Sequence, residues 1–260
     1  GIPGFVLEVG GPLYRFQQQR VRKQEGGVVA GDEEARPAGG TEEIEEEYGE
    51  EEEEEEEEEE VLMQVAQQEY RLQTLAQMLH VFSNLRFANM TRCPLGDDGS
   101  TVLAGAVGAG LPLKTLLLSK CSISPQGLVP WIQALACTDT LQNLDLSGNP
   151  ILDDGAHVLA DALLHCRSLR SLSVRGCSLS CSGAIQLVLG INQGHNSVRG
   201  LDLSSNFLMQ GGQAAELGGV LQESQLETLI LADNDFEDEE MVWVADLLRK
   251  NTHIVQLDLR

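Results

Sequence analysis

The sequence predicts an α/β solenoid, in which short parallel strands line the concave side of a horseshoe and helices form its convex side. Two observations predict this fold. A leucine pattern recurs every 28 or 29 residues between residues 85 and 260, and each interval has a strand-like half and a helix-like half. A disordered acidic region is expected to precede the repeats. Internal periods of roughly 20–50 residues are typical of solenoids.

Seven copies of the pattern keep the same register. They begin at residues 85, 113, 141, 169, 198, 226 and 254. The clearest copy runs from Leu141 through Leu144 and Leu146 to Asn149, and the last copy stops inside its strand-like half. We therefore expect residues 85–260 to form one domain with about six full repeats and a truncated seventh.

Each repeat has two halves with different periods. Apolar and polar residues alternate in the first half, as in Leu144-Asp145-Leu146, which is typical of a short strand. The second half has helical spacing, shown after Gly155 by Ala156, Leu159, Ala160, Leu163 and Leu164. Strands pack about 4.8 Å apart whereas helices need about 8–10 Å. The stack must therefore bend with its strands on the inside.

These residues resemble the leucine-rich repeat of the ribonuclease-inhibitor-like class, whose pattern is LxxLxLxx(N/C)xLxxxG followed by a helix. The resemblance covers residues 85–260. The Asn or Cys position holds Cys93, Cys121, Asn149, Cys177, Asn206 and Asn234. The resemblance implies that this side chain turns inward and hydrogen-bonds backbone groups of its own or the neighbouring turn. An amide does this well and a buried thiol weakly.

The N-terminal third has a different composition. Residues 42–60 contain 16 Glu among 19 positions, and neighbouring like charges disfavour an ordered structure. We expect residues 1–60 to be largely disordered and residues 61–84 to form a helix that caps the first repeat. Phe5–Val9 is expected to form a short strand, which the sequence does not assign to the main fold.

The overall charge argues against two kinds of partner. The chain carries 41 acidic and 17 basic residues, a formal net charge of −24, whereas nucleic-acid binding relies on positive surface. The uncharged, Gly-rich stretch Gly99–Leu113 is too short to span a bilayer. We therefore expect neither nucleic acid nor membrane to be a partner.

No motif predicts an enzyme. Cys177 and Cys181 form the only close cysteine pair, and no second pair or nearby His completes a zinc site. The five histidines have no metal-ligand spacing, and the Gly-rich segment Gly105–Gly110 lacks the GK[ST] ending of a phosphate loop. We expect no catalytic residue, metal or cofactor.

The cysteines indicate the compartment. Cys93, Cys121 and Cys177 occupy equivalent positions in different repeats, which favours six reduced thiols in the cytoplasm, with the nucleus and the cilium as alternatives. Because the chain begins with Gly1 and stops inside a strand, we expect it to be a fragment or processed product. Further chain or a partner is expected to cover its C-terminal end.

The resemblance implies a non-catalytic protein-interaction module or scaffold that binds a protein partner on its concave face. One alternative is a regulator of a small GTPase, because a Ran GTPase-activating protein has similar repeats and an acidic segment, although there the segment follows the repeats. Another alternative is a structural subunit of a large assembly such as the ciliary axoneme. A GTPase assay and the behaviour of the purified chain distinguish these alternatives.

Two rows of residues are candidates for the partner-binding surface. After the first Leu of each repeat comes a largely basic row: Arg86, Lys114, Gln142, Arg170, Arg199, Glu227 and Val255. Between the next two apolar residues comes a neutral-to-acidic row: Asn89, Leu117, Asp145, Ser173, Asp202, Ile230 and Asp258. Arg175 adds a positive charge further along its strand. The predicted partner has mixed charge, its acidic segment follows the basic row, and the chain's own Glu tract is a competitor for that row.

Overall fold

The computed structural model describes residues 6–8, 67–82, 84–194, 197–209, 212–236 and 241–260. One compact unit holds the first strand and Leu72–Arg260, and the other spans Gly11–Arg71. The Glu tract lies outside the described residues, so the expectation of disorder there stays a prediction.

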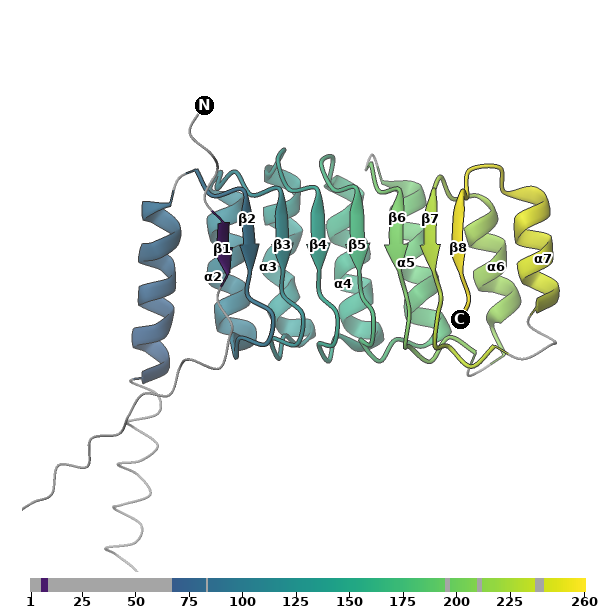
Figure 1. Cartoon of the computed structure of the whole chain (residues 1–260), viewed down its shortest axis with the longest axis horizontal. Coiled ribbons are helices and arrows are strands. Elements are labelled where there is room, and N and C mark those ends of the chain that lie inside the picture. Colours follow the sequence, from purple (N-terminus) through teal and green to yellow (C-terminus); the bar gives the residue numbers. More distant parts are fainter. Residues whose placement is uncertain (1–5, 9–66, 83, 195–196, 210–211, 237–240) are drawn as a thin grey trace, which may run out of the picture. The chain divides into compact units, whose positions relative to one another are not determined.

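Strands and helices alternate along the first unit (Figure 1). The strands are β1 (Val6–Glu8), β2 (Phe87–Asn89), β3 (Thr115–Leu117), β4 (Asn143–Asp145), β5 (Ser171–Ser173), β6 (Gly200–Asp202), β7 (Thr228–Ile230) and β8 (Gln256–Asp258). The helices are α2 (Gly96–Gly108), α3 (Pro125–Cys137), α4 (Leu152–His165), α5 (Cys181–Gln193), α6 (Ala214–Gln222) and α7 (Met241–Lys250).

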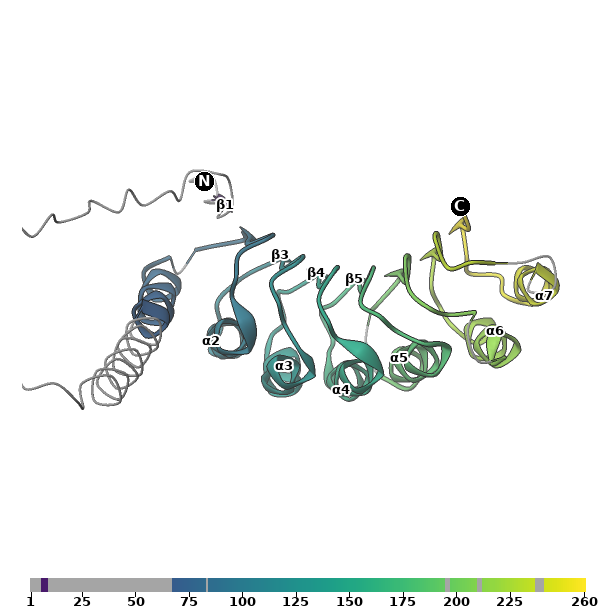
Figure 2. The same ribbon diagram turned by 90° about the horizontal axis from the view of Figure 1, so that it is seen from below.

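The strands form one parallel sheet in chain order from β1 to β8. Each strand from β2 to β8 begins two residues after a predicted repeat start, so the predicted register is confirmed. Figure 2 shows the strands on the inner side of a curve and the helices on its outer side. The α/β horseshoe fold predicted from the repeats is therefore confirmed.

The core lies between the sheet and the helices and is mainly aliphatic, as the low aromatic content requires. Leu116, Leu144 and Leu172, at the middle of their strands, are at most 2% exposed. Trp131 on α3 is fully buried and donates its Nε1–H to the Ser100 hydroxyl at 3.0 Å, which in turn donates to the Gly127 carbonyl at 2.7 Å. The polar atoms of this buried group are therefore satisfied.

A ladder of Asn and Cys side chains joins successive repeats behind the strands. Asn149 accepts the N–H groups of Cys121 and Ile123 at 2.9 and 3.1 Å, and it donates to the carbonyls of Leu118 and Leu146. Asn206 and Asn234 make equivalent bonds. The Cys121 thiol donates to Met90 O at 3.0 Å. The inward, backbone-bonding role implied by the resemblance is confirmed.

Residues 67–81 form a helix that precedes the repeats. In the part from Leu72 onward, Leu79 is 3% exposed and Leu75 and Phe82 pack against the core. The capping role that the sequence predicts for residues 61–84 stays a prediction, and residues 61–66 lie outside the described part. The N-terminal strand, which the sequence left unassigned, pairs with β2 as β1.

Candidate functional site

The open face of the sheet is formed by the first and third residue of each strand, because the middle residue points into the core. In β2, β3, β4, β6 and β7 the middle residue is buried and its two neighbours are partly exposed. Side chains on this concave face therefore stand in rows that run across the repeats.

The basic row lies at the start of the strands. Each of its members directly precedes a strand, and from Arg86 to Glu227 the backbone carbonyl of each member accepts two N–H groups from the next repeat. Lys114 O, for example, accepts from Gln142 N at 2.8 Å and Asn143 N at 2.9 Å. The backbone of the row is therefore fixed, while the side chains of Arg86, Lys114 and Arg170 are exposed.

The four cations of this row differ in how they are engaged. Arg86 donates to Pro112 O at 3.1 Å. Arg199 donates to Gln225 Oε1 at 3.1 Å, and its Nε lies 3.9 Å from Glu227 Oε1. Within the part of the chain that the structure describes, the side chains of Lys114 and Arg170 have no hydrogen bond or ion pair. These two charges are available to a ligand.

The acidic row is held by local hydrogen bonds. Asp145 accepts the N–H and hydroxyl of Ser147. Asp202 accepts the N–H and hydroxyl of Ser204 at 2.9 and 2.6 Å. Ser173 lies between them, with its hydroxyl 2.8 Å from that of Ser147 and 3.3 Å from Asp202 Oδ2. The two carboxylates therefore belong to one connected network that keeps their positions fixed.

Asp258 ends this row on β8. It pairs with Arg260, whose Nη2 lies 2.7 Å from Asp258 Oδ2. Hydrogen bonds from the Arg260 side chain and backbone lower the pKa of Asp258 to about 2. Asp258 is therefore ionised at neutral pH, but its charge is compensated by its neighbour.

Arg175 lies two residues beyond the end of β5 and so outside the two rows. Its Nη2 contacts Asp233 Oδ2 at 3.0 Å, and the Ser205 hydroxyl donates to the same oxygen at 3.1 Å. Both partners of the ion pair are more than half exposed, so the pair contributes at most about 1 kcal/mol to folding. Arg175 thus lies on the surface, but its side chain forms an ion pair with a residue of another repeat.

The concave face has a third row of residues that the sequence analysis did not include among the candidates. It consists of the first strand residues Phe87, Thr115, Asn143, Ser171, Gly200, Thr228 and Gln256. Asn143 donates to Thr115 Oγ1 at 3.0 Å, so this row also carries hydrogen bonds between repeats. The position directly before the second Leu of each repeat identifies it in the sequence.

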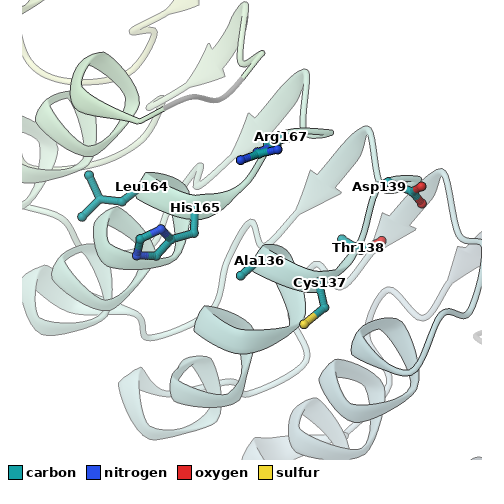
Figure 3. Close-up of a pocket in the computed structure, with 7 residues that line it drawn as sticks. All are labelled: Ala136, Cys137, Thr138, Asp139, Leu164, His165 and Arg167. Carbon is teal, nitrogen blue, oxygen red and sulfur yellow. The ribbon is translucent and has the colours of Figure 1, made fainter.

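A pocket with a volume of about 470 Å³ lies at the C-terminal ends of α3 and α4. It is lined by Ala136, Cys137, Thr138, Asp139, Leu164, His165 and Arg167. Figure 3 shows that the Cys137 thiol and the Asp139 carboxylate point away from each other. These two polar groups therefore do not converge in the pocket, whereas the polar groups of a small-molecule site do.

Within the part of the chain that the structure describes, no group of three or more His, Cys, Asp and Glu side chains is arranged to hold a metal ion. Among the same residues, every helix is too short or too polar to cross a membrane.

Comparison with known proteins supports the fold and the repeat type. A family described as "Leucine Rich repeat" matches residues 140–160. Ribonuclease inhibitor from Sus scrofa is 33% identical over 182 residues, which are 68% of this chain and 39% of that protein. NACHT, LRR and PYD domains-containing protein 14 from Homo sapiens is 29% identical, over 68% of this chain and 16% of that protein. The chain thus spans well under half the length of these relatives.

Among solved structures, Leiomodin-1 Actin-Binding Site 2 is similar with a TM-score of 0.48 and 18% identity, over 59% of this chain and 88% of that one. The repeat pattern, the Asn and Cys ladder and the sequence relatives together identify the class. The chain is a leucine-rich repeat protein, and its repeats are of the ribonuclease-inhibitor-like class.

Proposed function

We propose that this chain is a non-catalytic interaction module whose concave face binds an acidic segment of a protein partner. The observation that carries this proposal is the pair Lys114 and Arg170, two exposed cations that have no hydrogen bond or ion pair with any of the described residues and lie on a row whose backbone is fixed. The similarity to repeats of ribonuclease inhibitor supports a binding role.

The geometry of the two cations suits an extended acidic segment. They precede β3 and β5 and are separated by one strand, so their backbones lie about 10 Å apart at about 4.8 Å per strand. Gln142 lies between them on the same row and offers an amide for hydrogen bonding. A segment with acidic residues at this spacing contacts both cations without a change in the backbone.

The neighbouring acidic row adds specificity to this site. Asp145 and Asp202 are fixed by their serine networks, so they oppose a segment that is acidic throughout and favour one with basic or neutral residues on that side. The proposed partner surface is therefore mixed, with its acidic edge over the basic row.

The test is capture of partners from cell extract by the full chain, followed by affinity measurement with the purified partner. Charge reversal of Lys114→Glu and Arg170→Glu leaves folding unchanged and weakens binding by about 1–3 kcal/mol in total if the contact is desolvated. Arg199→Glu has a smaller effect, because Arg199 is already paired with Glu227.

The matched control reverses the same kind of charge on the convex side. Arg249→Glu and Lys250→Glu change exposed residues at the end of α7 and leave the affinity unchanged. If these helix variants lose the partner and the strand variants retain it, the site lies on the convex side and the proposal is wrong.

We infer that the protein works in a reducing compartment inside the cell. The inference is supported by the cysteines of the ladder, whose buried thiols occupy a position that also accepts Asn. The alternatives of a small-GTPase regulator and an axonemal subunit gain no specific support from the described residues. A GTPase assay with a panel of small GTPases tests the first, and sedimentation of the purified chain tests the second.

A further inference from the structure

The N-terminal strand β1 is an addition to the sheet that does not come from a repeat. It pairs with β2 in parallel, with Val6 opposite Phe87, Leu7 opposite Ala88 and Glu8 opposite Asn89. This register matches that of β2 on β3, where Ala88 is opposite Leu116. β1 therefore occupies the place that the strand of a preceding repeat would take.

The hydrogen bonds of β2 explain why a strand fits at this edge. Arg86 and Met90 flank β2. Arg86 O accepts N–H groups of the next repeat, and Met90 N donates to Leu117 O, so the even-numbered residues in and beside β2 direct their backbone groups toward β3. Successive residues of a strand direct these groups to opposite sides, so Phe87 and Asn89 direct theirs toward β1. An edge of this kind is a template for a further strand.

The attachment of β1 differs from that of the strands β2 to β7. Among β1–β8 and α2–α7, β1 contacts β2 alone, whereas β2 to β7 each have a strand on both sides. β1 is three residues long, and no helix directly after it is described. A short strand with a single neighbour belongs to the elements of a fold that open at the lowest free energy.

We propose that the edge of β2 is a strand-docking site, that β1 is its releasable occupant, and that the vacated edge binds the same N-terminal segment supplied in trans. The contacts are main-chain hydrogen bonds in a parallel register, as in other cases of strand addition. This site uses the backbone of Phe87 and Asn89 and none of the charged residues of the proposed partner surface. It is therefore independent of the function proposed above.

Two proline variants of the full chain test the proposal. In the shared register Leu7 is equivalent to Ala88, so its N–H faces β2 and Leu7→Pro removes a bond of the ladder. The N–H of Val6 faces away from β2, so Val6→Pro is the matched control. Both variants keep the charge and the repeats unchanged.

The first measurement is hydrogen exchange by mass spectrometry. Leu7→Pro increases the exchange rate of the Phe87 and Asn89 amides, which face β1, by about tenfold or more, and Val6→Pro leaves it unchanged. The amides of β5 serve as an internal reference, because a change there reports general unfolding and not release of β1. Equal exchange at Phe87 and Asn89 in all three chains, with β5 unchanged, overturns the proposal.

The second measurement adds a fluorescent peptide with the sequence of residues 3–11 and follows its anisotropy. The peptide binds the Leu7→Pro chain at least about tenfold more tightly than the wild-type chain, in which β1 occupies the edge. The open edge at β8 is identical in all chains, so binding there adds an equal signal to each. Equal binding to the wild-type, Val6→Pro and Leu7→Pro chains overturns the proposal.

Discussion

Asp153 accepts two hydrogen bonds from Ser180 in the next repeat, one from the backbone N–H at 2.8 Å and one from the hydroxyl. The same arrangement occurs two repeats earlier, where Asp97 accepts from Ser124 N at 2.7 Å and from its hydroxyl at 2.6 Å. Each serine in turn caps its own helix by accepting from the N–H two residues later. A carboxylate on one helix thus positions the start of the next helix.

Removing this carboxylate should destabilise the fold. Asp153→Ala leaves the Ser180 N–H without its acceptor and frees the capping hydroxyl, and we expect a loss of about 2 kcal/mol in the free energy of unfolding. Denaturation in urea measures the change. Asp154→Ala is the control, because Asp154 is acidic, adjacent and exposed. Equal losses in the two variants would contradict the role given to Asp153.

Two glycines inside helices should respond in opposite directions to the same substitution. A Cβ at Gly190 on α5 would lie 2.7 Å from the backbone of Ala160, whereas a Cβ at Gly105 on α2 meets nothing within 4 Å. We expect Gly190→Ala to destabilise the protein by about 1–3 kcal/mol through overpacking. Gly105→Ala should stabilise it by about 0.5–1 kcal/mol, because alanine has the higher helix propensity. The midpoints of thermal unfolding report both signs, and a stabilised Gly190→Ala chain would show that α4 and α5 can separate freely.

The amide and thiol members of the ladder should differ in their contribution to stability. Asn149 is 1% exposed and makes four hydrogen bonds to the backbone, so Asn149→Ala should cost about 3 kcal/mol or more because buried backbone groups lose their partners. Cys121→Ala removes only the weak thiol bonds to Met90 O and Ser119 O and should cost about 1 kcal/mol. Urea denaturation of both variants compares the two costs. A larger loss for Cys121→Ala would be the contrary result.

Reaction of the folded protein with a thiol reagent should distinguish the cysteines. Burial raises the pKa of Cys177 to about 12 and that of Cys121 and Cys181 to about 11, so these thiols remain protonated at pH 8. Cys137 is exposed at the end of α3. We expect Cys137 to react first and Cys121, Cys177 and Cys181 to react only after unfolding, with six thiols in total in denatured protein. Mass spectrometry of the labelled peptides gives the order, and early labelling of Cys177 would contradict the burial.

The same raised pKa values imply a dependence of stability on pH. The unfolded thiol ionises near pH 9.0 and the folded Cys177 thiol near 12, so its stabilising contribution is complete below pH 9 and is lost as the pH rises toward 12. Between pH 8 and pH 10 the wild-type chain should therefore lose more unfolding free energy than Cys177→Ala. Cys137→Ala, which changes an exposed thiol, should follow the wild type. Parallel losses in all three chains would show that Cys177 does not contribute.

The repeat strands and helices could be predicted from the sequence because the leucine spacing occurs seven times. The shared register fixes the position of each element even where a single copy departs from the pattern. The contacts at the helix starts could be predicted less well. Acidic residues in the first turn of a helix, such as Asp97 and Asp153, ordinarily interact with the free N–H groups of their own helix, but α2 and α4 have no side-chain cap hydrogen bond. Their carboxylates accept hydrogen bonds from a serine of the following repeat instead. Which partner they take depends on how neighbouring helices pack, and the local sequence does not show this.

The positions of the residues in the two candidate rows could be predicted from the sequence, but the ion pairs that their side chains make could not. The basic row follows directly from the repeat, whereas the availability of Arg170 and the engagement of Arg199 depend on which residue the next repeat presents. Glu227 happens to follow Arg199 in the row. The position of β1 was not predictable, because three residues without the leucine pattern carry no register and their partner lies far along the chain.

Each Asn of the ladder forms hydrogen bonds with the repeat that precedes it, and this affects how the chain folds during its synthesis. Asn149 satisfies the N–H groups of Cys121 and Ile123, which belong to the repeat before it, and Asn206 does the same for Cys177 and Leu179. A repeat that leaves the ribosome therefore still has unpaired groups until the Asn of the following repeat arrives. Folding during synthesis should therefore lag the emerging chain by one repeat.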